Sequence, residues 1–218
     1  MSEINLQLAK LIVPSADSLN GLSYLEQYPE HNVYHPGWDL NKGWGNDDLG
    51  LPIRCPIEGY VEYVSPKAYN GGFGLHMVIY HEKLGKWTHY VHLDNVTVTV
   101  GEKLKKNQLI AHIGKTGTSW AHLHFEVWTK ELYEIQPKGW WKKFRFYPSG
   151  WEKWKVAQHY MNPEEFLQLC VDLKPEEKKE PFRLPHWALR AVEWNNNLNP
   201  RPISNVDKPL FRYYSHKI

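Results

Sequence analysis

The sequence HLHFE, which begins at His122, constrains the fold more than any other part of the chain. Polar and apolar residues alternate strictly through it. Because successive side chains of a β-strand point to opposite faces, the alternation predicts a strand with His122, His124 and Glu126 on one face. Leu123 and Phe125 would then face an apolar layer. An ordinary half-buried strand has the same pattern, so the two histidines indicate a metal site only in combination with other motifs.

A second motif, HPGWD, begins at His35 and ends at Asp39. Imidazole and carboxylate groups are common ligands of catalytic zinc, so these two residues and a histidine of HLHFE could form such a site. A turn histidine and an Asx-turn aspartate around Pro36 and Gly37 would produce the same sequence. The motif therefore leaves a metal site and a simple turn open as alternatives.

The order of three motifs narrows the interpretation. Between HPGWD and HLHFE lies THYVHL, which contains His89 and His92. In this order the motifs resemble the LytM/lysostaphin-type zinc endopeptidases of family M23, which cut peptide cross-links in bacterial cell walls. The resemblance covers about residues 31–128. It extends to glycine-containing segments at residues 50–59, 71–81 and 101–117. It implies a mainly β fold, an antiparallel β-sheet core of the LytM/lysostaphin type with short C-terminal helices.

The resemblance also implies roles for five residues. The zinc ligands would be His35, Asp39 and His124, with Zn2+ as the cofactor. His122 would act as general base and His92 as its partner or as a transition-state donor, and these two roles could be exchanged. In such a site, bound zinc polarises the scissile carbonyl and makes hydroxide available at neutral pH.

Two other polar residues of these motifs have ordinary interpretations. If residues 87–93 form a strand, His89 lies on the face opposite His92, and we expect it at a sheet edge or on the surface. Glu126 shares the face of the two histidines of HLHFE. It could orient one of them or simply lie on the surface of the sheet.

The expected function is that of a zinc-dependent endopeptidase hydrolysing peptide bonds in bacterial peptidoglycan, in the stem peptide or the cross-bridge. The alternative is a non-catalytic M23-like zinc-binding module that acts as a phage structural or cell-wall-binding protein. The net charge is only +2, from 26 Lys and Arg against 24 Asp and Glu, which argues against a nucleic-acid partner. Cys55 and Cys170 form neither a zinc-ligand pair nor a disulfide framework.

The N-terminal sequence predicts how the protein reaches its substrate. It lacks a basic n-region and has only a short apolar run, so it is not a convincing signal peptide. No apolar stretch approaches the ~20 residues that a membrane span needs. We therefore expect a phage-encoded lysin or tail component, or another protein released by lysis, cytoplasmic before release and active at the bacterial cell wall.

Strands are expected where apolar and β-branched residues alternate or form runs. These segments are residues 59–65, 75–80, 87–93 and 96–100, the last reading VTVTV. Asn107 stands where the M23 sequences usually have glycine, and asparagine tolerates the left-handed conformation better than most residues.

The C-terminal half differs in composition. We expect residues 1–170 to form the peptidase domain, with an aromatic-rich extension at 129–160, and residues 171–218 to form a linker and a tail of unknown role. The extension could be a hairpin beside the cleft or a rim of aromatic residues on the sheet edge. Its candidate substrate contacts are Trp140, Trp141, Trp151 and Trp154. Asn162 and Pro163 predict the start of a helix, and residues 187–194 could form an amphipathic helix.

Overall fold

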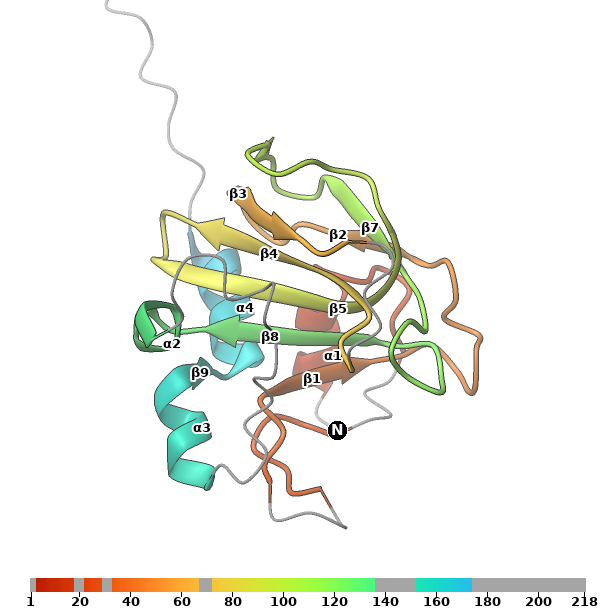
Figure 1. Ribbon diagram of the computed structural model, residues 1–218, viewed down its shortest axis with the longest axis horizontal. Coiled ribbons are helices and arrows are strands. Elements are labelled where there is room, and N and C mark those ends of the chain that lie inside the picture. The colour runs from red at the N-terminus through yellow and green to blue at the C-terminus, as the bar shows by residue number, and fades with distance from the viewer. Residues whose placement is uncertain (1–2, 18–21, 29–32, 67–71, 136–151, 174–218) are drawn as a thin grey trace, which may run out of the picture. The chain divides into compact units, whose positions relative to one another are not determined.

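The computed structural model describes residues 3–17, 22–28, 33–66, 72–135 and 152–173 (Figure 1). The chain divides into two units, Met1–Lys174 and Pro175–Ile218. All the described residues belong to the first unit. Trp140, Trp141, Trp151 and residues 187–194 lie outside the described residues. The boundary at residue 170 and the separate tail stay predictions.

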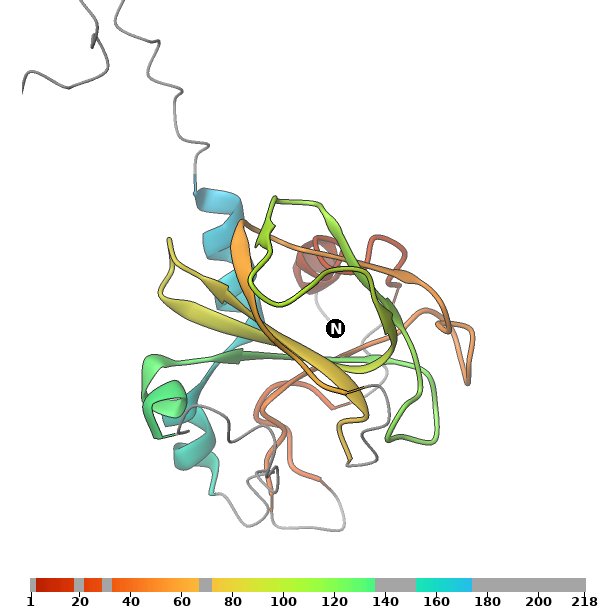
Figure 2. The ribbon, with the colours of Figure 1, turned by 45° about the horizontal axis from the view of Figure 1, so that its top comes forward.

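Antiparallel pairing joins nine strands of the described residues into one sheet. The strands are β1 (Gly37–Leu40), β2 (Pro52–Arg54), β3 (Gly59–Val64), β4 (Leu75–His81), β5 (Lys86–Val96), β6 (Lys103–Leu104), β7 (Leu109–Ile113), β8 (Leu123–Trp128) and β9 (Tyr160–Met161). The main path of neighbours is β1-β8-β5-β4-β3-β6, while β7 pairs with β2 and β5, and β9 with β8. Figure 2 shows how the sheet twists and curls along this path. The predicted mainly β, antiparallel fold is confirmed.

Four helices accompany the sheet in the described part of the chain. They are α1 (Glu3–Ala9), α2 (Lys130–Ile135), α3 (Lys153–His159) and α4 (Pro163–Asp172). The side chain of Asn162 accepts a hydrogen bond from the Glu164 N–H at 3.0 Å, and Pro163 follows it, so the predicted start of α4 is confirmed. None of these described helices has the length and apolar character that a membrane crossing requires.

The alternation in β8 separates two apolar clusters. Leu123, Phe125 and Val127 belong to the main core, where they pack together with α1, α4 and residues of the neighbouring strands. Both α1 and α4 contribute buried side chains, and the two helices contact each other. His124 and Glu126 therefore lie on the opposite face of β8, as the sequence predicts.

On that opposite face, helices cover the end of the sheet that is remote from His122. Trp128 packs there with Trp87 of β5 and with Leu132 of α2. Val78 of β4, Val156 of α3 and Tyr160 of β9 also belong to this second cluster. The described parts of the aromatic-rich extension are thus mainly helical. The hairpin alternative is wrong for these described parts, which cover the sheet as the other alternative proposed.

The VTVTV segment is not a strand beyond its first residue. Val96 ends β5, and the Glu102 N–H then donates to the Thr99 carbonyl across a turn. Glu102 also accepts from the Thr99 N–H, and Val100 is 61% exposed. Alternation alone predicted a strand here, but local side-chain hydrogen bonds stabilise a turn instead. The left-handed conformation predicted for Asn107 is confirmed by its φ of 66°.

Candidate metal centre

The pairing of β1 with β8 brings the first and third motifs together. Asp39 lies directly opposite His124 in this ladder. A Cβ atom on Gly37 would lie 2.1 Å from the carbonyl oxygen of Phe125, so the close approach of the two strands requires glycine at this position. His35 precedes β1, and its backbone exchanges hydrogen bonds with the segment before it: its N–H donates to Glu26 and its carbonyl accepts from Leu25.

Three side-chain atoms converge at this point. Nε2 of His35 lies 2.9 Å from Nδ1 of His124 and 3.2 Å from Oδ1 of Asp39. Oδ1 of Asp39 is also 2.8 Å from Nδ1 of His124. One ligand atom from each residue lies within 4.8 Å of the other two, so the group has the composition and spacing of a metal site. The structure thus brings together all three residues that the sequence predicts as ligands.

The remote nitrogens of both histidines face groups that only accept hydrogen bonds. Nδ1 of His35 lies 3.3 Å from the Ser23 carbonyl oxygen. Nε2 of His124 lies 2.9 Å from a carboxylate oxygen of Glu126. Each remote nitrogen must therefore carry hydrogen. The hydrogen of a neutral imidazole is thereby placed away from the centre, and its lone pair points into the centre.

Burial and charge shift two pKa values at this centre. Burial would raise the pKa of Asp39, but His35 and His124 hold it well below its usual range. Burial would lower the pKa of His124, but hydrogen bonds to Asp39 and Glu126 raise it to about 10. In the metal-free protein at neutral pH, Asp39 is therefore ionised. A metal that binds Nδ1 of His124 must displace a proton.

The two remaining predicted histidines lie side by side at the edge of this centre. The ring centroids of His92 and His122 are 4.6 Å apart, and that of His92 is 6.2 Å from that of His124. Nδ1 of His92 donates to the Thr116 carbonyl at 2.9 Å, and Nδ1 of His122 donates to the Trp120 carbonyl at 3.0 Å. In the neutral state, Nε2 of each ring is then an acceptor with a free lone pair.

Both rings are neutral at neutral pH. Burial lowers the pKa of His92, and the neighbouring His122 and His124 lower it further, to about 3. Burial also lowers the pKa of His122, although Asp39 partly opposes the shift. An uncharged imidazole with an accessible lone pair is the form that accepts a proton in general base catalysis.

An unusual backbone conformation places His92. Its φ is 64°, in the left-handed region that non-glycine residues rarely adopt. The alternation of side chains in β5 is interrupted here, and the ring of His92 reaches the face on which His124 lies. Gly74 supports this arrangement, because a Cβ atom there would lie 2.2 Å from the carbonyl oxygen of Thr116, which orients His92. Such strain is typical of functional sites.

His89 and Glu126 do not lie on the surface of the sheet, where their ordinary interpretations would place them. His89 is 0% exposed, so the expected surface position is wrong. It lies opposite Glu126 in the β5–β8 ladder and contacts its carboxylate. Glu126 is 2% exposed, which excludes the sheet-surface alternative, and it contacts His124. The interrupted alternation at His92 explains why period-two counting separated His89 from this face.

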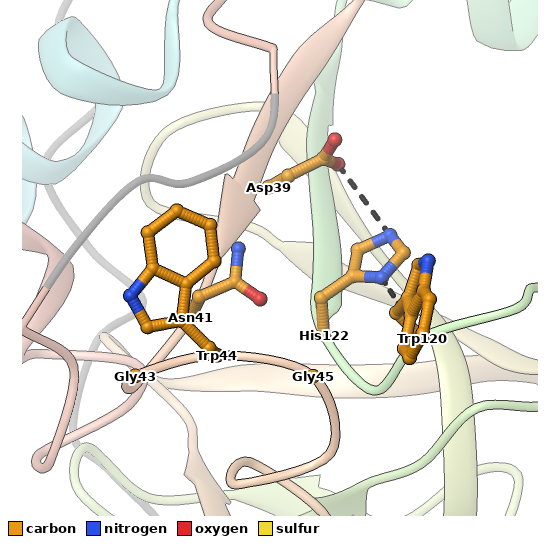
Figure 3. A pocket seen from close by; sticks show the side chains of 7 residues that line it. All are labelled: Asp39, Asn41, Gly43, Trp44, Gly45, Trp120 and His122. Carbon is orange, nitrogen blue, oxygen red and sulfur yellow. Dashed lines mark hydrogen bonds and ion pairs between the residues drawn. The ribbon is translucent and has the colours of Figure 1, made fainter.

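Beside the centre lies a pocket of about 480 Å³ (Figure 3). Asp39 and His122 form part of its wall, and Trp44 and Trp120 lie on opposite sides of it. These two tryptophans are 83% and 64% exposed. Sequence reasoning did not identify either of them, because a single tryptophan in a loop carries no periodic signal.

The loop that carries Trp44 is fixed by side-chain acceptors. The Gly43 N–H donates to Asp17 at 3.1 Å, and the Trp44 N–H donates to Asp47 at 3.3 Å. The Ala121 N–H donates to the Asn46 side chain at 3.2 Å, which joins this loop to the segment that carries Trp120. The backbone segments that carry the two exposed indoles are therefore fixed by these hydrogen bonds and joined to each other.

Comparisons with known proteins agree with the site. A model of peptidase family M23 matches residues 33–137. The chain is 31% identical over 125 residues to the glycyl-glycine endopeptidase ALE-1 of Staphylococcus capitis, covering 54% of this chain and 34% of that protein. It is 39% identical over 85 residues to the peptidoglycan DD-endopeptidase ShyB of Vibrio cholerae, covering 37% of this chain and 19% of that protein. These two relatives are therefore much longer than the matched region.

A third relative is matched over most of its length. The chain is 38% identical over 78 residues to the lipoprotein NlpD of Yersinia enterocolitica, covering 36% of this chain and 77% of that protein.

Proposed function

Because the chain belongs to peptidase family M23, we propose that it is a zinc-dependent endopeptidase that hydrolyses peptide bonds in bacterial peptidoglycan, in the stem peptide or the cross-bridge. The observation that carries the proposal is the convergence of three ligand atoms, from His35, Asp39 and His124, beside two neutral histidines. A purely structural zinc site has four protein ligands and no such neighbours.

The donor set fits zinc. Two imidazole nitrogens and one carboxylate oxygen are typical of catalytic zinc sites, which keep a fourth position open. Both imidazoles have their remote N–H groups fixed by acceptors, and this pre-orients the ligand lone pairs. When bound, zinc would polarise the scissile carbonyl group and lower the pKa of a water molecule to ~7.

His122 is the proposed general base. Its Nε2 atom lies 3.9 Å from Oδ1 of Asp39, so the lone pair is near the ligand atoms and faces the pocket. Nε2 takes a proton from the attacking water as the oxygen bonds to the carbonyl carbon. When the carbon–nitrogen bond breaks, the same atom passes the proton to the departing amine nitrogen. The Trp120 carbonyl holds the ring in the tautomer required for both steps.

His92 is the proposed partner of His122. The Thr116 carbonyl fixes its Nδ1–H, so Nε2 of the neutral ring can accept but cannot donate a hydrogen bond. We therefore assign His92 to orienting the attacking water or stabilising protonated His122. Direct donation to an oxyanion would require a proton on Nε2, which burial disfavours.

The pocket is the proposed binding site for the peptide around the scissile bond. A ligand between Trp44 and Trp120 would lie against Asp39 and His122 and therefore beside the reacting groups. Peptide is favoured over glycan as the bound portion because the bond to be cut must lie at this position. The names of two relatives, a glycyl-glycine endopeptidase and a peptidoglycan DD-endopeptidase, support a cell-wall peptide.

The bacterial cell wall is accordingly the proposed site of action. Release from the cytoplasm by a phage or by lysis stays a prediction, which fractionation of producing cells before and after lysis would test.

Digestion of purified sacculi tests the function. We expect the zinc-loaded protein to release soluble fragments, and mass spectrometry of the fragments should reveal new amino and carboxyl termini at one type of peptide bond. A chelator and the Asp39→Ala variant serve as controls. Binding to sacculi without cleavage would support the alternative of a non-catalytic wall-binding module.

A further inference from the structure

Glu126 is the centre of a buried hydrogen-bond network behind the candidate metal centre. It lies two residues after His124 on β8, so both side chains project from the same face. One carboxylate oxygen accepts from Nε2 of His124 at 2.9 Å. The other accepts from Nδ1 of His89 at 2.9 Å and from Nε1 of Trp128 at 2.7 Å. Three ring donors thus satisfy one carboxylate that is excluded from water.

His89 continues the network onto the next strand. It is the cross-strand neighbour of Glu126 on β5. Because its Nδ1 donates to the carboxylate, its Nε2 must accept when the ring is neutral, and it receives a hydrogen bond from Nδ1 of His76 at 2.8 Å. His76 lies on β4, so three adjacent strands contribute to one continuous chain of hydrogen bonds.

Aromatic packing holds the His89 ring in this orientation. The ring centroid of His76 is 5.0 Å away at an interplanar angle of 72°, and that of Phe73 is 5.2 Å away at 75°. Trp128 packs at 4.9 Å and also donates to the carboxylate. Rotation of the imidazole would break both hydrogen bonds and these ring contacts, so His89 restrains Glu126.

The direction of these hydrogen bonds has a consequence for His124. A carboxylate accepts only, so Nε2 of His124 keeps its hydrogen, and Nδ1 is the nitrogen that can offer a lone pair to a metal. Nδ1 is the atom that faces His35 and Asp39. Without Glu126, the buried Nε2–H of His124 would lose its acceptor. The tautomer with hydrogen on Nδ1 would then become more populated, and in that tautomer Nδ1 cannot bind a metal.

We propose that Glu126 and His89 form a positioning network that holds His124 in its metal-binding tautomer. Glu126 acts directly on the ligand, and His89 acts through Glu126. This inference rests on the proposed zinc function, because it assigns to both residues a role in metal affinity. Loss of comparable outer partners typically weakens metal binding by about 10–100-fold.

Zinc affinity of the full chain, measured by competition with a chromophoric chelator, tests the network without reference to activity. We expect His89→Leu and Glu126→Gln to weaken zinc binding by about 10–100-fold. His89→Asn places an amide N–H at the position of Nδ1 and should recover most of the affinity. The visible spectrum of the cobalt-substituted protein should shift in the first two variants and return in the third.

His81→Gln is the matched control. His81 is also a buried histidine of the sheet with two hydrogen bonds, to Glu58 and Thr88, but it has no contact with this network. We expect it to lower thermal stability and to leave zinc affinity unchanged. If His89→Leu does not fold, Glu126→Gln decides the question by the same measurement.

The outcomes separate two failures. If Asp39→Ala binds zinc as tightly as the unmodified protein, the proposed metal site is wrong. If Asp39→Ala loses zinc but His89→Leu or Glu126→Gln keeps both the original affinity and the cobalt spectrum, the metal site stands and the positioning network is wrong.

Discussion

Asp39 and His124 face each other across the β1–β8 ladder, with Oδ1 of Asp39 2.8 Å from Nδ1 of His124. Strand pairing alone thus places the last residue of HPGWD against the second histidine of HLHFE. Backbone hydrogen bonds on both strands fix the separation, and Gly37 allows the strands to approach. Two of the three candidate ligands, Asp39 and His124, are therefore held in place by the sheet, and His35 lies just before β1.

The first prediction concerns metal content. We expect the purified protein to hold about one zinc ion per chain, because three convergent ligands make a preorganised site. Asp39→Ala and His124→Ala should lose the ion, as measured by elemental analysis after removal of loosely bound metal. Asp94→Ala, a change at an exposed carboxylate outside the centre, should retain it. Full zinc retention in both ligand variants would show that the assignment is wrong.

The second prediction separates ligand from catalyst within HLHFE. His122→Ala should retain zinc and the fold but lose activity on sacculi by about 10²–10⁴-fold, the range for a positioned general acid or base. His112→Ala is the control, since His112 lies on β7 and bonds to Asn95. Near-normal release of wall fragments by His122→Ala would remove His122 from the mechanism.

The third prediction concerns the pocket wall. Trp44→Ala and Trp120→Ala should each raise KM by about 2–13-fold, the effect of losing the ~0.5–1.5 kcal/mol that a specific aromatic contact supplies. Zinc content should not change, because neither indole belongs to the candidate ligand set. The orientation of His122 should also be kept, because the Trp120 carbonyl that accepts its hydrogen bond belongs to the backbone. Trp154, a candidate substrate contact on sequence grounds, does not line this pocket, so Trp154→Ala, at a 58% exposed position on α3, controls for the loss of a surface indole. An unchanged KM in both pocket variants would exclude these indoles from substrate binding.

Acid stability provides the fourth prediction. Burial lowers the pKa of His81 from 6.5 to about 4. As the pH falls, the unfolded chain therefore takes up a proton at His81 before the folded protein does. The contribution of His81 to the free energy of unfolding is complete above pH 6.5 and is lost progressively as the pH falls towards 4. With about 1.4 kcal/mol per pKa unit, the difference reaches about 3 kcal/mol near pH 4.

Urea unfolding between pH 7 and pH 4 measures this effect. His81→Gln cannot take up the proton, so its free energy of unfolding should fall less steeply with acid than that of the unmodified protein. His112→Gln, at a partly exposed position, is the control. If the free energy of unfolding falls equally steeply with pH in the unmodified protein and in His81→Gln, His81 is not the source of the acid sensitivity.

Local sequence patterns were sufficient for much of the sheet and for one helix start. The alternation in HLHFE assigned the correct faces of β8, because both faces are buried against different layers. Asn162 and Pro163 predicted the start of α4, since a capping side chain and a proline satisfy the first turn locally. Such features depend on neighbours in sequence.

Features that depend on tertiary contacts were not predictable in the same way. The left-handed conformation of His92 interrupts the alternation of β5, so the rings of His89 and His92 reach the same face although period-two counting separates them. The position of Trp44 depends on acceptors such as Asp17, which is far away in sequence. The VTVTV segment has the alternation of a strand but forms a turn after Val96, because the Glu102 side chain accepts a hydrogen bond from the backbone N–H of Thr99.

The last prediction tests where the catalytic unit ends. A chain truncated after Lys174 should remain folded and zinc-loaded, because it retains all of α4. A chain truncated after Thr129 should not fold, since it loses Phe166 and Leu167 from the main core and Tyr160 from the second cluster. Burial of each large apolar side chain stabilises the fold by about 1.5–3 kcal/mol, and total stability is only about 5–15 kcal/mol. Circular dichroism and zinc analysis would distinguish the two truncated proteins. If the chain ending at Lys174 unfolds or loses its metal, residues 175–218 belong to the catalytic domain, and the division into a domain and a tail is wrong.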